Sequence, residues 1–187
     1  MTTRAQLLTI ADWDAMPYGD GNRYEIIEGE LFVSCSPGLT HQTVLANLIT
    51  LFVIFLQKNP VGRFLPMPGL ILSEHSGVIP DLVIFLHEQS DEILKDGRLT
   101  GAPALVIEIV SPGAANIRRD RVTKVELYSK HGVPEYWIVD PENLTVDQYV
   151  SQGGSLKLIQ TLHRKDILSS SAIPDFSCLV SDIFIRI

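Results

Sequence analysis

Two acidic residues stand inside runs of apolar residues. Glu108 lies in the middle of the run ALVIEIV, and Asp81 opens the run DLVIFL directly after Pro80. Removing an unpaired carboxylate from water costs several kcal/mol or raises its pKa by roughly 3–5 units, so it normally needs a cation, a metal ion or strong hydrogen-bond donors beside it. Two carboxylates on neighbouring strands can hold a hard cation such as Mg²⁺ (or Mn²⁺), which prefers oxygen ligands. The pattern therefore predicts a divalent metal site.

Each carboxylate also has an interpretation that needs no metal. Glu108 can be bonded to a nearby arginine or to backbone amides, which would compensate its charge without catalysis. An aspartate that follows a proline at the start of a strand, as Asp81 does, is often only a turn residue. The sequence leaves both alternatives open.

A lysine follows the two acids on a segment with helical spacing. Asp120, Lys124 and Tyr128 recur every four residues and so share one helix face, which can lie over the sheet near Glu108. The long lysine side chain would then bring its ammonium group to the acidic site. The alternative is an ordinary surface pair between Asp120 and Lys124, worth a few tenths of a kcal/mol.

The basic residues of the chain are concentrated in one place. Arg118, Arg119, Arg121 and Lys124 follow directly on the strand of Glu108. The formal net charge of −7 argues against nucleic acid, because affinity for phosphate backbones comes mostly from lysine and arginine. A local basic cluster beside a bound cation can still hold a polyanion, with an affinity that falls as salt rises. A solvated helix face is the alternative for each arginine.

The elements that must position these residues follow from the hydrophobic pattern. Both acid-bearing runs are almost continuously apolar, which predicts central strands covered on both faces of a sheet. A helix over NIRRDRVTKVELYSKHG is expected to end at His131 and Gly132, and Pro134 leads into the strand EYWIVDP, so a strand-helix-strand unit results. Tyr136 and Trp137 on this last strand are expected to pack in the core.

The remaining segments predict a mixed α/β order. RYEIIEGELFVS indicates two strands that turn near Glu28 and Gly29, and residues 41–58 indicate a helix packed between the sheet and other elements. Residues 144–150 and 155–162 indicate weaker strands, and HEQSDEILKDGRL is expected to form one surface loop. Thr9 and Asp12 resemble a capping arrangement for a short helix.

Length and composition favour one compact domain over residues 1–187, of which 45% are hydrophobic and 20% charged. Cys35 and Cys178 have no partner at metal-ligand spacing, which favours a reducing cytoplasm. The opening residues do not form a secretory signal, and the most apolar stretch, residues 44–56, is shorter than the roughly 20 residues needed to cross a bilayer. We therefore expect a cytoplasmic protein that does not enter the membrane.

Three segments carry a resemblance to a known family: PDLVIFL, GAPALVIEIVSP and DRVTKVELYSKHGVPEYWIVDP. The chain resembles a widespread family of restriction-endonuclease-like proteins of unknown biological role, within the PD-(D/E)xK nuclease superfamily. The resemblance also includes YEIIEGEL and the helix that starts at His41. It covers the chain from about Tyr24 to Asp140, with a weaker match as far as Phe184, and the long EIVSP to EYWIVDP block is its specific part.

The resemblance implies an α/β (α+β) fold of the restriction-endonuclease-like kind, with a mixed central sheet flanked by helices. It matches Asp81 to the aspartate of the superfamily and Glu108 to its acidic partner. The superfamily pattern has a lysine two residues after this acid, but this chain has Val110 there. The family usually places the lysine on the following helix, and Lys124 stands at that place.

Two further residues gain a role from the resemblance alone. Glu25, the first acid of YEIIEGEL, corresponds to a glutamate that related nucleases place near their metal, whereas at least two of Glu25, Glu28 and Glu30 must be solvated hairpin residues. His41 matches a histidine at the start of the family's helix. It would either contact a substrate phosphate or hydrogen-bond nearby backbone.

The resulting hypothesis is a metal-dependent endonuclease that hydrolyses phosphodiester bonds in DNA by attack of a metal-activated water. Asp81, Glu108 and a backbone carbonyl near Ile109 would coordinate Mg²⁺ (or Mn²⁺). Lys124 would orient the water or offset charge on the phosphoryl oxygens, with Glu25 as a further catalytic candidate. The residues expected to contact DNA are His41, Arg118 and Arg121.

Other classes of function remain open. A nuclease fold that has lost its activity can serve as a binding module for nucleic acid or protein, and Val110 in place of the lysine motivates this alternative. A structural or partner-binding protein, with carboxylates bonded internally, is the third possibility. Because cutting duplex DNA usually needs one site for each strand, the hypothesis also predicts a homodimer.

Overall fold

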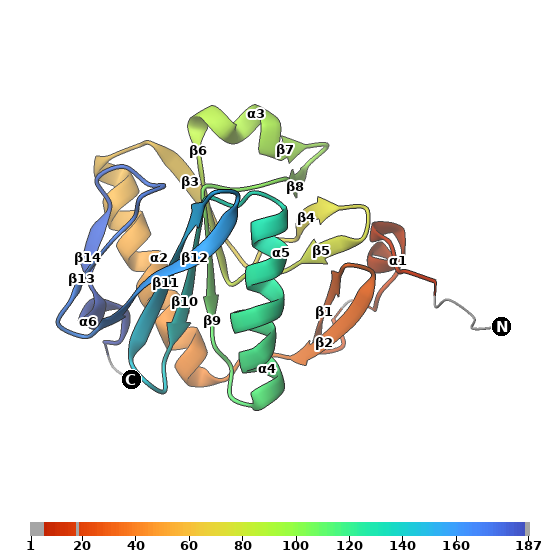
Figure 1. The fold of residues 1–187 in the computed structure, drawn as a ribbon, viewed down its shortest axis with the longest axis horizontal. Helices are drawn as coiled ribbons and strands as arrows, with labels where there is room; N and C mark the ends of the chain where they lie inside the picture. Colours follow the sequence, from red (N-terminus) through yellow and green to blue (C-terminus); the bar gives the residue numbers. More distant parts are fainter. Residues whose placement is uncertain (1–5, 18, 186–187) are drawn as a thin grey trace.

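The computed structural model describes residues 6–17 and 19–185 (Figure 1). Part of the opening segment and both ends of the expected 1–187 domain lie outside these residues. The described part of the chain forms two six-stranded sheets, one two-stranded sheet and the helices that cover them. The helical elements are α1 (Ile10–Asp14), α2 (Leu39–Lys58), η1 (His87–Gln89), α3 (Ser90–Ile93), α4 (Ala114–Arg118), η2 (Arg119–Thr123), α5 (Lys124–Lys130) and α6 (Val180–Ile183).

The first six-stranded sheet is mixed and holds the two acid-bearing runs. Strands β9 and β10 are parallel neighbours, and the other neighbouring pairs are antiparallel. The strands in spatial order are β12 (Ser155–His163), β11 (Thr145–Gln152), β10 (Glu135–Asp140), β9 (Leu105–Ile109), β6 (Leu82–Leu86) and β3 (Gly62–Pro66).

The second six-stranded sheet carries the N-terminal hairpin. Glu28 and Gly29 have φ angles of 52° and 83°, the left-handed conformation that a tight two-residue hairpin turn requires. The predicted turn is therefore confirmed, as is the capping box between Thr9 and Asp12 at α1. The strands in spatial order are β2 (Glu30–Cys35), β1 (Asn22–Ile27), β5 (Ser76–Val78), β4 (Leu70–Ser73), β8 (Arg98–Thr100) and β7 (Leu94–Lys95).

The expectation of one surface loop over HEQSDEILKDGRL is wrong. This segment contains η1, α3, β7 and β8, and β8 pairs in parallel with β4. The reason is that Ile93 and Leu99 are both buried in the core, although the polar residues around them hide any periodic pattern. The C-terminal hairpin of β13 (Ile167–Ser169) and β14 (Ser177–Leu179) was likewise not indicated by the sequence.

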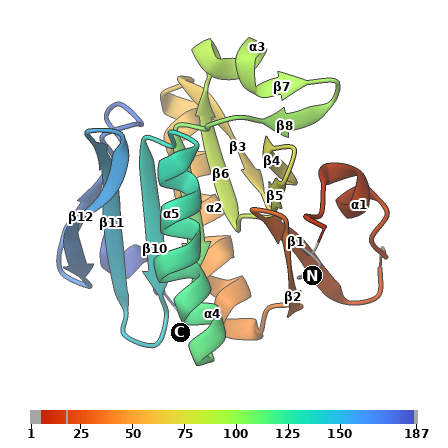
Figure 2. The ribbon, with the colours of Figure 1, turned by 45° about the vertical axis from the view of Figure 1, so that its right-hand side comes forward.

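Both faces of the mixed sheet are covered, as its apolar strands predict. Helices α2 and α6 and the β13–β14 hairpin pack on one face, whereas α5 and the second sheet pack on the other (Figure 1 and Figure 2). Every residue of β9 is buried, and so is every residue of β10, including Tyr136 and Trp137. The strand that carries Glu108 is therefore a rigid support.

Helix α2 is longer and more exposed than the sequence indicated. Its 20 residues make it, by length and composition alone, the one helix in the described part of the chain that is long and apolar enough to cross a membrane. Val44, Leu48 and Phe52 lie fully in the core, whereas Leu39 is 85% exposed and Ile54 is 49% exposed. The expected helix with packing on both sides is therefore a helix with one buried and one exposed face.

Strand alternation puts Asp81 and Glu108 on the same face of the sheet. Val83 of β6 pairs with Val106 of β9, and both belong to the core beneath α5. Asp81 and Glu108 each lie two residues from this pair, in the direction in which the antiparallel register brings them next to each other. The two acids therefore meet beneath α5 at one end of the pair of strands.

The helical segment after β9 runs from Ala114 to Lys130 and contains one π turn, η2. Such π turns are rare and occur frequently at functional sites. The hydroxyl of Tyr136 donates to the backbone oxygen of Asp120 at 3.0 Å, which supports the wider turn. Gly132, with a φ angle of 75°, follows the end of the helix as the sequence predicts.

Candidate active site: a buried acidic cluster

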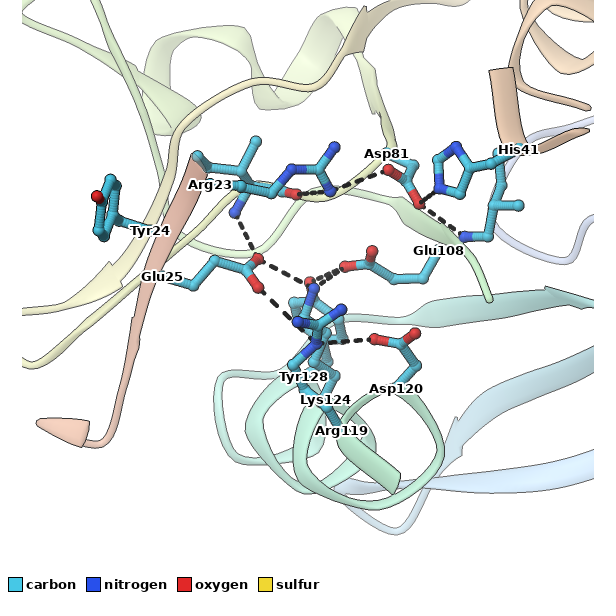
Figure 3. Close-up of polar contacts among 12 residues, drawn as sticks. Arg23, Tyr24, Glu25, His41, Asp81, Glu108, Arg119, Asp120, Lys124 and Tyr128 are labelled. Atoms are coloured by element: carbon cyan, nitrogen blue, oxygen red, sulfur yellow. Dashed lines mark hydrogen bonds and ion pairs between the residues drawn. The ribbon is translucent and has the colours of Figure 1, made fainter. Parts of the chain in front are cut away.

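Asp81 lies at the entrance of β6 and is only 1% exposed. Its Oδ1 accepts a hydrogen bond from Arg23 Nη1 at 3.1 Å. Its Oδ2 lies 3.0 Å from His41 Nε2 and accepts from the backbone N–H of Ile109 at 2.8 Å (Figure 3). These bonds exclude an ordinary turn residue, because the side chain is buried and joins three separate elements: β1, α2 and β9.

Glu108 lies on β9 and is 2% exposed. Its Oε1 accepts from Lys124 Nζ at 2.7 Å and from the hydroxyl of Tyr128 at 2.9 Å (Figure 3). Its Oε2 receives no hydrogen bond from the described residues. One oxygen of this carboxylate is therefore held from α5, while the other keeps its lone pairs available.

Lys124 is fully buried and joins the sheet to the N-terminal hairpin. Its ammonium donates to Glu108 on β9 and, at 3.0 Å, to Glu25 Oε1 on β1. Glu25 is 1% exposed, and the same oxygen accepts from the backbone N–H of Ile79 at 2.9 Å. Of the three acids in the hairpin Glu25 is the buried one, whereas Glu28 and Glu30 are exposed, as the sequence required for at least two of them.

Arg119 and Asp120 complete the cluster from the π turn. Asp120 is 1% exposed and accepts from Arg119 Nε at 3.3 Å, and the same nitrogen lies 4.0 Å from Glu25 Oε2. Asp120, Lys124 and Tyr128 thus face the sheet together, as their spacing predicts. The alternative of a surface pair between Asp120 and Lys124 is wrong, because both side chains are buried.

The electrostatics of the cluster divide its acids into two kinds. Burial raises the pKa of Glu108 to about 8, and the nearby charges of Asp81, Asp120 and Glu25 add to this against the attraction of Lys124. Burial also raises the pKa of Asp120, against the attraction of Lys124 and Arg119. Without a further cation, the carboxyl of Glu108 therefore holds a proton at neutral pH.

Asp81, Glu25 and Lys124 keep their charges. Burial works to raise the pKa of Asp81, but the hydrogen bond from His41 and the charge of Arg23 outweigh it and hold that pKa below its ordinary value. The pKa of Glu25 is lowered because Lys124 and Arg119 outweigh its burial. Burial would lower the pKa of Lys124, but the facing acids hold it above the ordinary value.

The predicted site residues separate into those that lie in the cluster and those that do not. Asp81, Glu108, Lys124 and Glu25 lie in it, and His41 contacts Asp81 and not merely nearby backbone. Ile109 contributes its backbone N–H to Asp81.

The two arginines expected to contact DNA lie elsewhere. The side chain of Arg121 pairs with Asp140 and Asp147 on β10 and β11, which engages its charge. Arg118 is exposed on α4. The four basic residues that are close together in the sequence are therefore separated in the structure. Of these four, Lys124 was expected at the buried acidic site and lies there.

The sequence did not single out Arg23 or Arg119 as residues that would contact the buried acids. Arg23 is two residues before Glu25 on β1, so strand alternation places both on one face, and this period was the available signal. Arg119 is adjacent to Asp120, whose face was recognised. The π turn between α4 and α5, which shifts the helical phase at this point, has no sequence signature.

The donors of the cluster fit a hard divalent cation in their chemistry. No group of three or more His, Cys, Asp or Glu side chains in the described ranges is arranged to hold a metal. Mg²⁺, however, is usually bound by one or two carboxylates together with waters and substrate phosphates. A carboxylate has about four acceptor positions. Glu108 uses two of them and Asp81 three, so both retain a free position for a cation.

Comparisons with known proteins bear on the family and the fold of the chain. A family model named Uma2, described as "Putative restriction endonuclease", matches residues 10–181. The crystal structure of a protein from Anabaena variabilis, described as "a putative nuclease belonging to DUF820", matches with a TM-score of 0.75 at 18% identity, over 95% of this chain and 97% of that chain. This match confirms the predicted fold class.

A second solved structure, of the type IIG restriction endonuclease BpuSI, matches with a TM-score of 0.40 at 12% identity, over 77% of this chain and 15% of that chain. No curated protein sequence matches the chain significantly.

Proposed function

The chain belongs to the Uma2 family of restriction-endonuclease-like proteins, and from this membership we propose that it is a metal-dependent endonuclease that hydrolyses phosphodiester bonds in DNA. The observation that carries the proposal is the position of Lys124, fully buried and 2.7 Å from Glu108 Oε1. Val110 cannot polarise a water or a phosphate, and Lys124 supplies the missing ammonium from the neighbouring helix. The substitution at the usual lysine position is therefore compatible with activity.

The free acceptor positions of Asp81 and Glu108 would hold Mg²⁺ or Mn²⁺, together with a backbone carbonyl near Ile109. A bound Mg²⁺ supplies positive charge close to the phosphate, where negative charge increases during hydrolysis. Its charge also favours the ionised form of Glu108, because a nearby opposite charge lowers the pKa of a carboxyl. The raised pKa of Glu108, caused mainly by burial, supports the proposal because a bound cation would offset it.

Lys124 has three N–H donors, and two of them are engaged by Glu108 and Glu25. The third can donate to the attacking water or to a phosphoryl oxygen. Glu25 holds the ammonium in place from β1, so we propose that it positions Lys124 as well as contributing charge. A preorganised donor of this kind typically contributes about 100-fold or more to the rate.

The proposal is tested by incubating purified protein with supercoiled plasmid and with single-stranded DNA, with EDTA, Mg²⁺ or Mn²⁺. We expect cleavage only with metal, and a loss of roughly 100-fold or more in Asp81→Asn, Glu108→Gln and Lys124→Met. Glu92→Gln, which changes an exposed acid on α3, is the control and should cleave as the wild type does. Equal cleavage by all variants would identify a contaminant and contradict the proposal.

A calorimetric titration with Mn²⁺ separates the nuclease from the alternatives. The wild type is expected to give a binding heat that Asp81→Asn and Glu108→Gln lose. A folded wild type that binds DNA without metal and never cleaves it would be the binding module that Val110 motivates. A folded protein with neither metal nor DNA binding would have a structural role.

We also propose that the protein acts as a homodimer, because two sites are needed to cut the two strands of a duplex. Exposed apolar residues on α2 and β12, among them Leu39, Ile54, Leu158 and Ile159, are compatible with a contact between subunits. Sedimentation velocity should give the mass of two chains. A monomer at micromolar concentration would contradict this part of the proposal.

A further inference from the structure

Arg23 on β1 is a buried cation whose hydrogen-bonding capacity is only partly used. Its side chain is 13% exposed. Nη1 donates to Asp81 Oδ1 at 3.1 Å and lies 3.4 Å from the backbone oxygen of Ile79. Nη2 is buried and has no hydrogen-bond partner among the described residues. Arg23 therefore contacts Asp81 through one nitrogen of its guanidinium group and leaves the other without an acceptor.

An unpaired donor on a buried guanidinium is unfavourable unless something else supplies the acceptor. Leaving a buried polar group without a partner costs about 1–3 kcal/mol, and more for a charged group. The planar guanidinium matches two oxygens of a carboxylate or a phosphate at once. Arg98 shows such a match within this chain, since its two terminal nitrogens contact the two carboxylate oxygens of Asp14 at 3.0 Å and 2.6 Å.

The position of Arg23 indicates which acceptor it lacks. Arg23 approaches Asp81 from the opposite side to His41 (Figure 3), and it also lines a cavity of about 640 Å³. Ile79, Trp13 and Tyr24 line the same cavity, which is within the size range of small-molecule sites. An anion held in this cavity would therefore lie against Arg23, the residue that carries the unpaired donor.

We infer that Arg23 is a phosphate-binding residue, and that its free Nη2 takes a non-bridging oxygen of a phosphate group in the DNA strand that the site holds. This inference rests on the proposed function and goes beyond it by assigning the contact to the phosphate backbone. Nη1 stays on Asp81, so one guanidinium joins the substrate to the acid that would hold the metal. The contact is independent of base sequence, because every nucleotide carries the same phosphate.

The competing role for Arg23 is purely structural, as a counter-ion that balances the charge of Asp81 and contacts no substrate.

 The two roles differ in what removing the side chain does to DNA binding when no metal is present. A counter-ion for Asp81 alone affects DNA binding only through the charge that its removal leaves on Asp81, so removing it has no effect once Asp81 is replaced by asparagine. A phosphate contact adds one ionic contact to the complex. Its loss weakens binding and lowers the slope of log affinity against log salt by about one.

The test measures fluorescence anisotropy of a fluorescein-labelled single-stranded oligonucleotide in EDTA, over a series of salt concentrations. Arg23→Met is expected to weaken binding roughly 10-fold to 100-fold, the range for a hydrogen bond to a charged group, and to lower the slope of log affinity against log salt by about one. Arg98→Met, which removes an arginine already paired with Asp14, is the matched control and should bind as the wild type does. Equal affinity of Arg23→Met and wild type overturns the inference, as does a wild type that does not bind the oligonucleotide.

A second pair of variants keeps the test valid if Arg23→Met folds poorly with Asp81 left unpaired. Asp81→Asn removes the neighbouring negative charge, so it should bind the oligonucleotide more tightly than the wild type in EDTA. Adding Arg23→Met to Asp81→Asn should remove that gain without leaving an unpaired acid. No difference between Asp81→Asn and the double variant overturns the inference.

The result is distinguishable from the outcome for the nuclease activity. Metal-dependent cleavage by the wild type together with unchanged binding by Arg23→Met overturns the phosphate contact and leaves the nuclease proposal standing. Binding that depends on Arg23 without any cleavage overturns the nuclease proposal and leaves a phosphate-binding site.

Discussion

Two buried glutamates on neighbouring strands of the mixed sheet are bonded in opposite ways. Glu108 on β9 and Glu135 on β10 are 2% and 0% exposed. Glu108 is held through one oxygen, by an ammonium and a phenol hydroxyl, and three other charged groups, Asp81, Asp120 and Glu25, lie near it. Glu135 is held through both oxygens, and every donor is neutral. The same residue type therefore serves two different purposes about one strand apart.

The bonds of Glu135 fix the C-terminal segment to the sheet. Its Oε1 accepts from Trp137 Nε1 at 2.6 Å and from Gln148 Nε2 at 2.7 Å. Its Oε2 accepts from four donors between 2.8 and 2.9 Å: the hydroxyls of Ser170 and Ser171 and the backbone N–H groups of Ser171 and Ala172. A carboxylate with all of its acceptor positions filled has nothing left to bind. Glu108, with one oxygen free, is the one suited to a ligand.

The largest effect is expected at Glu135, where a substitution should lower the stability of the fold. Glu135→Gln places an NH₂ group against donors of Ser171 and Ala172, so two backbone N–H groups lose their acceptor. The free energy of unfolding should fall by about 4 kcal/mol, since each such loss costs about 1–3 kcal/mol. Denaturant titration measures it, with the exposed Glu142→Gln as control. A decrease below about 1 kcal/mol would mean that Glu135 does not anchor this segment.

Glu108→Gln is expected to show the opposite pattern. Cleavage should fall by roughly 100-fold or more, because the ligand oxygen and its charge are lost. The free energy of unfolding at pH 4.5 should change by less than about 1 kcal/mol, because Glu108 is protonated in the folded protein without metal and a glutamine oxygen can still accept from Lys124 and Tyr128. A large loss of stability without loss of cleavage would reverse the assignment of the two glutamates.

The pH dependence of stability sharpens the comparison further. The pKa of Glu108 in the folded protein is about 8, above its ordinary 4.5, so the folded state binds more protons than the unfolded state between these values. Its contribution to stability is fully present below pH 4.5 and is lost as pH rises through 8, with a slope of up to about 1.4 kcal/mol per pH unit.

The measurement is the difference in the free energy of unfolding between wild type and Glu108→Gln in EDTA. A difference is needed because Asp81 and Glu25, whose pKa values are lowered, act in the opposite sense at acid pH. These two acids stabilise the fold above their unfolded pKa values and lose that effect as pH falls through the folded ones. A difference that stays constant from pH 5 to pH 8 would contradict the raised pKa of Glu108.

The contrast between the two glutamates also explains what the sequence could predict. Glu108 stands out because all of its neighbours in ALVIEIV are apolar. Glu135 follows Pro134 at the start of a strand and resembles a turn residue, and its donors on Ser170 to Ala172 are 35 to 37 residues away. Local pattern detects a buried charge only where the strand around it is apolar on both sides.

The same limit applies to the fold, since elements with a local signal could be predicted and elements without one could not. The central strands, the N-terminal hairpin and the strand-helix-strand unit each have a local period or a turn signal, and each is found. Short strands such as β7, β8, β13 and β14 owe their existence to pairing with distant segments, which a local pattern does not contain. Arg23 belongs to the same class, since its contact with Asp81 spans 58 residues.

The smallest expected effect concerns the hydroxyl of Tyr128, which donates to the same oxygen of Glu108 as Lys124 does. With both donors on Oε1, the side chain is held so that Oε2 is the oxygen left for a ligand. Tyr128→Phe removes one of them. Mn²⁺ affinity should fall roughly fivefold, the equivalent of one net hydrogen bond, with little change in stability.

A role in packing alone would give a different result. Loss of a donor to the ionised form also raises the pKa of Glu108, so the pH at which Mn²⁺ binds half-maximally should move upward in Tyr128→Phe. Tyr149→Phe on β11 is the control, because it removes a hydroxyl from a half-buried tyrosine that packs against Tyr136. If both variants bind Mn²⁺ as the wild type does at every pH, then Lys124 alone orients Glu108, and the distinction from Glu135 rests on the charges around it and not on which oxygen is held.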